Sequence, residues 1–157
     1  MRTNIRSFTA GVLFALVAAL PAAAADLALA GTWKLDPAKS HFSNGELPSK
    51  LTLTIEADGA DGIRYRSANL VAGKPGGVTW TAHFDGKENP VSGTEAYDTV
   101  TVEKVNARTF HLQMRKHGEL AVDLTYTVAA DGQSLKRKGE SHKAGKENRF
   151  DEWFDRQ

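Results

Sequence analysis

An alternation of apolar and polar residues, repeated in run after run, is the feature that most constrains the fold of this chain. Apolar residues occupy every second position of segments 51–56, 78–85, 110–115 and 120–128. A period of two is that of a β-strand with one buried face and one face in water. Asp-Gly and other glycine-containing pairs separate the segments, and glycine supplies the positive φ that tight hairpins need.

The alternation predicts an all-β protein, an antiparallel up-and-down meander closed into a β-barrel of about 8–10 strands. Short hairpins between successive strands make a meander, and a long meander tends to close because closure removes its exposed edges. The predicted strands cover residues 31–36, 50–57, 62–71, 77–85, 97–105, 108–116, 119–129, 133–141 and 147–156.

Three segments interrupt this pattern. Residues 36–49 are too irregular for a strand. Asp36 can cap a helix and Pro37 suits a first helical position, so we expect a short helical turn at Pro37 and the two residues after it, followed by a loop. Residues 87–96 are predicted to form a long loop at the mouth of the barrel. The glycine-rich residues 73–77 are predicted to form a turn.

Residues 1–25 have the parts of a secretory signal peptide. Arg2 and Arg6 form a basic start, an apolar stretch follows, and small residues before Asp26 supply a cleavage site. The apolar stretch is shorter than the roughly 20 residues that a membrane-spanning helix needs. We therefore expect cleavage, which leaves residues 26–157 as a single domain in the periplasm or outside the cell.

The charge balance gives this chain no general attraction for nucleic acid. The sequence has 20 Lys and Arg residues and 19 Asp and Glu residues, and loss of the predicted signal peptide leaves 18 and 19, a net charge of −1. We expect neither nucleic-acid binding nor stable membrane insertion. The sequence has no cysteine, which excludes disulfides, zinc thiolate sites and cysteine nucleophiles.

Several short motifs carry a family resemblance. They are Gly31-Thr32-Trp33-Lys34-Leu35-Asp36, Ala38-Lys39-Ser40, Phe42, Phe84-Asp85-Gly86-Lys87, Pro90-Val91-x-Gly93, Asp98-Thr99-Val100, Asp131-Gly132-x-Ser134-Leu135 and Phe154-Asp155-Arg156-Gln157. Through them the chain resembles a group of small exported bacterial proteins with a lipocalin-like (calycin-type) β-barrel, over nearly all of its length after the predicted signal peptide. The wider lipocalin group binds small, mostly apolar molecules, so the resemblance implies such a role by analogy of fold. Two lipocalin features are missing from the sequence, a midway Thr-Asp-Tyr triplet and a segment for a helix after the last strand.

The resemblance also implies how one end of the barrel is closed. In the wider group a Gly-x-Trp strand, here Gly31 and Trp33, is covered by a basic residue from the last strand. Arg156 is the best match for that residue, and Arg149 is second. A cation over an indole face contributes about 0.5–2 kcal/mol, depending on how far it is desolvated. We expect these residues to be structural rather than ligand-binding.

Five aromatic residues are candidates for lining a ligand cavity. Trp80, Phe84 and Tyr126 lie on the apolar faces of predicted strands and are the first choice, with Tyr65 and Phe110 beside them. A barrel of this size can leave room for one small ligand. The predicted function is therefore that of an exported protein that binds a small, apolar or lipid-like molecule inside the barrel. The alternative is a non-enzymatic interaction or stress-protective module whose core is filled by its own aromatic residues.

No combination of residues predicts catalysis, a metal site or a cofactor. His83 and Asp85 share one strand face and His111 could stand near them, but a metal needs three or four converging ligands. Ser141 and His142 are adjacent, and adjacent residues of a strand point to opposite faces, so they cannot form a hydrogen-bonded pair.

A basic run near the C-terminus has two possible meanings. As a solvated hairpin, its charges would discourage edge pairing. As a docking patch, it would bind an anionic lipid surface or another polyanion. The run comprises Lys136, Arg137, Lys138, Lys143, Lys146 and Arg149.

Overall fold

The computed structural model describes residues 27–44, 47–143 and 145–157. The predicted signal peptide and its cleavage site before Asp26 lie outside these residues. Within them the chain forms strands and no helix, so none of the described segments is a helix long and apolar enough to cross a membrane. The strands are β1 (Gly31–Phe42), β2 (Lys50–Ala57), β3 (Gly62–Val71), β4 (Lys74–Gly76), β5 (Thr79–His83), β6 (Asn89–Ser92), β7 (Thr99–Lys104), β8 (Thr109–Lys116), β9 (Glu119–Val128), β10 (Ser134–Lys143) and β11 (Lys146–Arg156).

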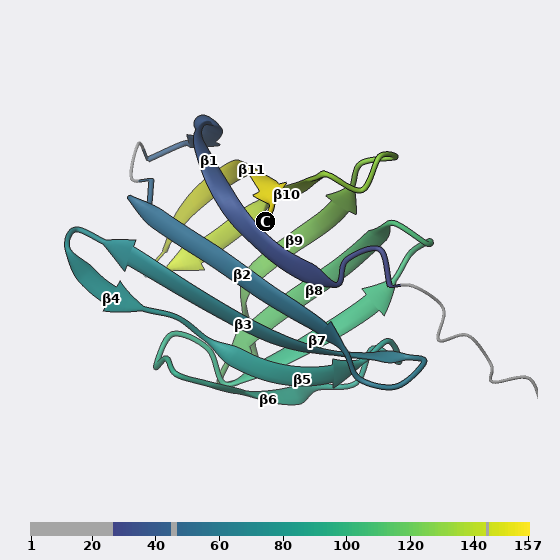
Figure 1. Cartoon of the computed structure of the whole chain (residues 1–157). Helices are drawn as coiled ribbons and strands as arrows, with labels where there is room; N and C mark the ends of the chain where they lie inside the picture. The colour runs from purple at the N-terminus through teal and green to yellow at the C-terminus, as the bar shows by residue number, and fades with distance from the viewer. Residues whose placement is uncertain (1–26, 45–46, 144) are drawn as a thin grey trace, which may run out of the picture.

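The strands form one closed antiparallel barrel (Figure 1). Each barrel strand pairs with the next one along the chain, and β11 pairs with β1 to close the ring. Ten strands make up the barrel, and β4 is an additional short strand that pairs only with the end of β3. The predicted fold, an all-β up-and-down meander closed into a barrel, is confirmed.

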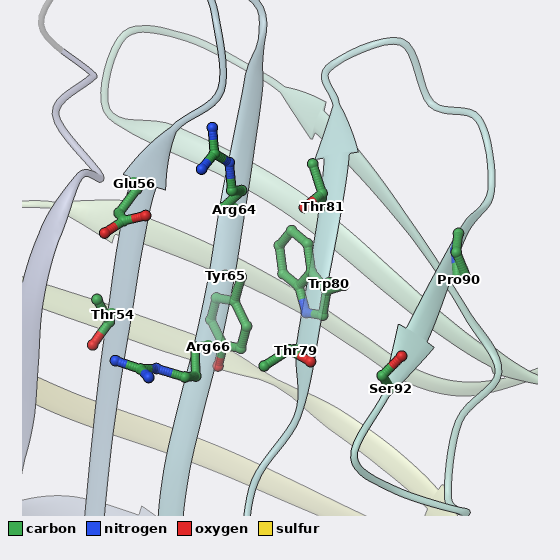
Figure 2. Close-up of a pocket in the computed structure, with 10 residues that line it drawn as sticks. All are labelled: Thr54, Glu56, Arg64, Tyr65, Arg66, Thr79, Trp80, Thr81, Pro90 and Ser92. Atoms are coloured by element: carbon green, nitrogen blue, oxygen red, sulfur yellow. The ribbon is translucent and has the colours of Figure 1, made fainter.

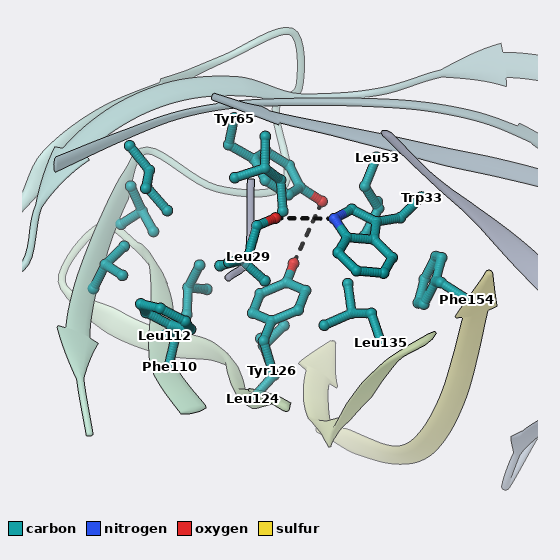
Figure 3. Close-up of a cluster of buried hydrophobic side chains, with 14 of the residues drawn as sticks. Leu29, Trp33, Leu53, Tyr65, Phe110, Leu112, Leu124, Tyr126, Leu135 and Phe154 are labelled. Atoms are coloured by element: carbon teal, nitrogen blue, oxygen red, sulfur yellow. Dashed lines mark hydrogen bonds between the residues drawn. The ribbon is translucent and has the colours of Figure 1, made fainter. Parts of the chain in front are cut away.

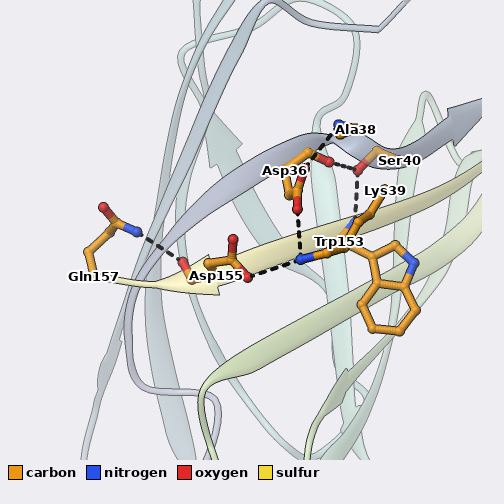
Figure 4. A network of polar contacts seen from close by, with 7 residues as sticks. All are labelled: Asp36, Ala38, Lys39, Ser40, Trp153, Asp155 and Gln157. Atoms are coloured by element: carbon orange, nitrogen blue, oxygen red, sulfur yellow. Dashed lines mark hydrogen bonds and ion pairs between the residues drawn. The ribbon is translucent and has the colours of Figure 1, made fainter.

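The predicted helical turn after Asp36 is wrong, because β1 continues as a strand to Phe42. Its register against β11 shifts between Asp36 and His41, where Pro37 has no N–H for the ladder. Local hydrogen bonds replace the missing pairing (Figure 4). The Ala38 amide donates to Asp36 Oδ1 (2.9 Å), Ser40 Oγ donates to the Asp36 carbonyl (2.7 Å), and Ser40 Oγ accepts from the Trp153 amide on β11 (2.9 Å).

Two other predicted loops contain short strands. The segment 87–96 includes β6, which pairs with β5 and β7 through two residues on each side. The segment 73–77 includes β4, which extends the β3 hairpin beyond the barrel wall. The Ala72-Gly73 turn of that hairpin has positive φ at both residues, the geometry that matches the twist of two-residue hairpins. Sequence periodicity misses such strands because they are too short to repeat.

The core fills the inside of the barrel, where alternate residues of each strand point (Figure 3). The barrel has two distinct ends. At the plug end β1 begins and β10 begins, whereas at the cavity end β1 finishes and β11 begins. The largest fully buried side chains include Trp33, Tyr126, Phe110, Phe154 and Leu135.

Candidate ligand site inside the barrel

The plug end is closed by Trp33 and Arg156. The Trp33 side chain is fully buried, and its Nε1 donates a hydrogen bond to the Leu29 carbonyl (2.9 Å, Figure 3). The Arg156 guanidinium carbon lies 4.1 Å from the centroid of the Trp33 ring. The same guanidinium donates to three backbone carbonyls, those of Gly132 (2.6 Å), Ala30 (2.7 Å) and Ala28 (3.0 Å).

Gly31 leaves the space that Arg156 occupies. A Cβ atom at this position would overlap Arg156 Nη1, and the backbone φ of +141° lies in the region that favours glycine. The structure thus brings together the three residues, Gly31, Trp33 and Arg156, that the family resemblance assigns to barrel closure. Arg149, the second choice, is 74% exposed and pairs with Glu147 instead.

The five aromatic residues predicted to line a cavity pack mainly against one another. Tyr65 and Trp80 stack with ring centroids 4.6 Å apart, and Phe84 and Phe110 lie 5.4 Å apart in a tilted pair. The Tyr126 hydroxyl donates to the Tyr65 hydroxyl at 3.5 Å. Of the five, Tyr65 is the one that borders the interior cavity. The other four fill the barrel between that cavity and the plug.

The interior cavity lies at the cavity end and has a volume of about 250 Å³. Its rim reaches the surface at Val71, which is 45% exposed. Ser67 and Ser141 are the small residues among its walls. The apolar part of the lining comes from Phe42, Leu51, Val78, Met114, Val122, Leu124 and Phe150.

A buried ion pair, Arg137 with Glu152, also lines this cavity. The two residues are cross-strand neighbours on β10 and β11, and their side chains are 14% and 0% exposed. Arg137 Nε donates to Glu152 Oε2. The guanidinium carbon lies 5.3 to 6.0 Å from the ring centroids of Phe154, Phe150 and Tyr126. A charged pair inside an apolar barrel makes this the most polar point of the interior.

The prediction that the whole basic run lies on the surface, as a solvated hairpin or a docking patch, is wrong for Arg137, whose side chain is largely buried. Along β10 the inward positions alternate, so that Leu135 and Arg137 point into the barrel while Lys136 and Lys138 point out. Glu152 has the same inward parity as the buried Phe154 on β11. The alternation in the sequence shows that both residues occupy inward positions of their strands. A charged residue at an inward position on each of two neighbouring strands is the signal that predicts this pair.

The pair shifts the pKa values of the groups around it. Burial alone would lower the pKa of Arg137, but the Glu152 carboxylate and the hydroxyls of Tyr126 and Tyr65 outweigh burial and hold that pKa well above its ordinary value. Burial raises the pKa of Tyr65 well above its ordinary value. Burial likewise raises the pKa of Tyr97, and the nearby Arg137 charge partly offsets this. Arg137 therefore remains a cation at any physiological pH.

A second depression, of about 560 Å³, lies outside the barrel (Figure 2). It is formed by outward-facing threonine and charged side chains of β2, β3 and β5, with Pro90 and Ser92 of β6 at its margin. Arg64 in its wall pairs with Asp58 at 2.8 Å. Two of the predicted lining residues, Tyr65 and Trp80, also border this depression, although both are buried. The rest of the lining is mostly polar, so the depression offers an apolar ligand less shielding than the interior cavity does.

The residues considered for metal binding or catalysis do not converge. His83 lies 3.6 Å from Asp61, and His111 lies 2.9 Å from Asp123. No group of three or more His, Cys, Asp or Glu side chains that could hold a metal occurs in residues 27–44, 47–143 and 145–157. Ser141 borders the cavity, whereas the His142 ring is directed to Glu140 (3.3 Å).

Comparisons with known proteins support the fold. No family model and no curated protein sequence matches the chain. Solved structures that are similar to it include the following three. A redesigned β-barrel has a TM-score of 0.53 and 14% identity over 85% of this chain and 95% of its own. EF1p2_mFAP2b bound to DFHBI has a TM-score of 0.51 and 11% identity over 85% of this chain and 98% of its own. Rv2717c from M. tuberculosis has a TM-score of 0.54 and 16% identity over 83% and 93%. At these identities the likeness shows a β-barrel fold.

Proposed function

We propose that this protein is an exported, lipocalin-like binding protein that holds a small, largely apolar molecule in the cavity end of the barrel. The observation that carries the proposal is the interior cavity, with its apolar walls, its rim at Val71 and the charged pair within it. An apolar hollow with a few convergent polar groups is the usual form of a small-molecule site. One structural neighbour, EF1p2_mFAP2b, is bound to DFHBI in its solved structure.

The size of the cavity limits the ligand. Its volume of about 250 Å³ lies just below the roughly 300–1,000 Å³ of common ligand pockets. A short alkyl chain or a single small ring system matches this volume, and a large polycyclic molecule does not. The ligand is therefore a small one, held with its apolar part against Met114, Val122 and Leu124.

A fluorescence titration with naphthalene, a neutral compound with a single small ring system that meets this size limit, tests the binding function. We expect saturable binding of one probe per chain to the protein without residues 1–25. Ser141→Phe should abolish binding, because the new ring fills the cavity beside Ser141. Lys138→Phe, an exposed position on the same strand, is the matched control and should bind as the parent does. Absence of saturable binding by the parent would contradict the proposal.

Export is a separate part of the proposal and has its own test. Its support is the sequence of residues 1–25, with a basic start, an apolar stretch and small residues before Asp26. Mass spectrometry of the protein from its native cells should find an N-terminus at Asp26 in the periplasmic or secreted fraction. A full-length chain recovered with the cytoplasmic proteins would contradict export.

A second candidate function is that of a non-enzymatic interaction or stress-protective module with a filled core. The observation in its favour is the packing of Trp80, Phe84, Phe110 and Tyr126, which fill the middle of the barrel instead of lining a ligand cavity. A bare protein mass in native mass spectrometry, unchanged after exposure to a lipid extract, would favour this candidate over a binding protein.

A further inference from the structure

One oxygen of the interior ion pair has no partner. Glu152 Oε2 accepts from Arg137 Nε, whereas Glu152 Oε1 is buried and has no hydrogen-bond partner among the described residues. The Glu152 side chain is 0% exposed and borders the cavity. A buried acceptor without a donor is costly. A ligand that offers a donor at this point would remove that cost.

Arg137 offers the complementary group. Arg137 also borders the cavity, and the bond to Glu152 is the single hydrogen bond that its guanidinium makes within the described part of the chain. A guanidinium has five N–H donors, so donors remain for a ligand. The two side chains together present one acceptor and several donors, while their charges neutralise each other.

We propose that the polar floor of this cavity selects ligands with a neutral head group that both donates and accepts a hydrogen bond, such as a primary amide or an alcohol. The inference rests on the proposed binding function and specifies its ligand class. An amide N–H₂ would donate to Glu152 Oε1, and its carbonyl would accept from Arg137. A carboxylate would accept from Arg137 but would be repelled by Glu152 and could not donate to it. An ester would accept only, and would leave Glu152 Oε1 unpaired.

Octanamide, methyl octanoate and octanoate are suitable probes, because they share an alkyl chain and differ at the head. Calorimetric titration of the protein without residues 1–25 gives a dissociation constant for each. The measured quantity is the ratio of the ester constant to the amide constant, compared between variants so that the different solubilities of the two compounds cancel. We expect octanoate to bind the parent protein more weakly than octanamide.

The double variant Arg137→Leu/Glu152→Leu removes both charges together. Replacing both members of a buried pair by apolar residues is often neutral for stability, so this variant is expected to fold. It should lower the ester-to-amide ratio at least about tenfold, because an apolar floor no longer satisfies the amide. Lys136→Gln/Asp151→Asn is the matched control. It neutralises an outward pair on the same two strands, 2.9 Å apart, and should leave the ratio unchanged.

Glu152→Gln provides an independent reading. It keeps the shape of the side chain and leaves the charge of Arg137 uncompensated, so octanoate should bind this variant about tenfold or more tighter than it binds the parent. An equal ester-to-amide ratio in the parent and the double variant would overturn the head-group inference and leave the binding function standing. Tighter binding of octanoate to the parent than to Glu152→Gln would also overturn the head-group inference and leave the binding function standing. If none of the three compounds binds, both proposals are overturned.

Discussion

The two ends of the barrel are built from the same strands but are filled differently. At the plug end Trp33 and Phe154 are fully buried, and neither residue borders the interior cavity. At the cavity end the same interior contains a hollow of about 250 Å³. Alternation cannot cause this difference, because inward and outward residues alternate equally well at both ends.

On two strands, β10 and β3, the inward side chains become smaller towards the cavity end. On β10 the inward series runs from Leu135 and Arg137 to Gly139 and Ser141, towards the cavity end. On β3 the inward side chains change from the large Tyr65 to the small Ser67, and both residues border the cavity. Small residues cannot meet across the interior, so the walls remain apart there. The plug end is therefore filled by large side chains, whereas the cavity end leaves the open space that the proposed function requires.

Truncation of the plug should have the largest effect. Trp33→Ala removes a fully buried indole, its hydrogen bond to Leu29 and the surface on which Arg156 lies. We expect the free energy of unfolding to fall by about 3–5 kcal/mol, measured by urea denaturation. At temperatures where the variant stays folded, probe binding at the opposite end should be unchanged.

Trp153→Ala is the matched control for the plug. Trp153 is only partly buried, and Lys136 lies 4.9 Å from the centroid of its ring. Its removal should cost about 1 kcal/mol or less. Equal losses for the two tryptophans would mean that the plug has no special role in closing the barrel.

Removal of one member of the interior ion pair should lower the free energy of unfolding strongly, whereas removal of both members should lower it much less. Glu152→Leu alone leaves the Arg137 cation buried without its partner, and we expect a loss of about 3–5 kcal/mol. Arg137→Leu in the same chain should restore most of this loss, because no uncompensated charge remains. Thermal denaturation of the single and double variants measures the coupling. Additive losses would show that the two side chains do not act as a pair.

Arg156→Ala should have an intermediate effect on the plug end. The variant loses a cation 4.1 Å from the Trp33 ring centroid and three hydrogen bonds to backbone carbonyls. We expect a loss of about 1–3 kcal/mol. Lys136→Ala removes a more exposed cation from the Trp153 ring and should cost about 0.5 kcal/mol. Urea denaturation of both variants compares the two cation–ring contacts directly.

The closed meander was predictable from the sequence, whereas the position of the cavity was not. Alternation and glycine turns identify strands wherever a run is long enough to repeat, and this fails for β4 and β6. Of the inward aromatic residues predicted as the lining, Tyr65 borders the cavity, whereas Trp80, Phe84, Phe110 and Tyr126 do not. The other walls of the hollow include both large residues, such as Phe42 and Phe150, and the small residues Ser67 and Ser141. Only the register between strands shows which small residues face one another.

Tyr65 lies between the filled and hollow parts of the barrel. Removal of its hydroxyl group should have the smallest effect on stability at neutral pH. Tyr65→Phe keeps the ring stacked on Trp80 and loses a long contact with the Tyr126 hydroxyl (3.5 Å), so a loss below about 1 kcal/mol is expected.

The effect of the Tyr65 hydroxyl on stability should appear at alkaline pH. The pKa of Tyr65 is raised by burial, whereas in the unfolded chain it has its ordinary value near 10.0. The unfolded chain therefore releases this proton first, and stability that is complete below that pH is lost as pH rises above it. The parent protein should lose more stability than Tyr65→Phe between neutral pH and the alkaline range, in urea denaturation followed at several pH values. Parallel pH profiles for the two proteins would show that the Tyr65 hydroxyl is accessible to water and that the cavity extends deeper into the barrel than the packing around Tyr65 indicates.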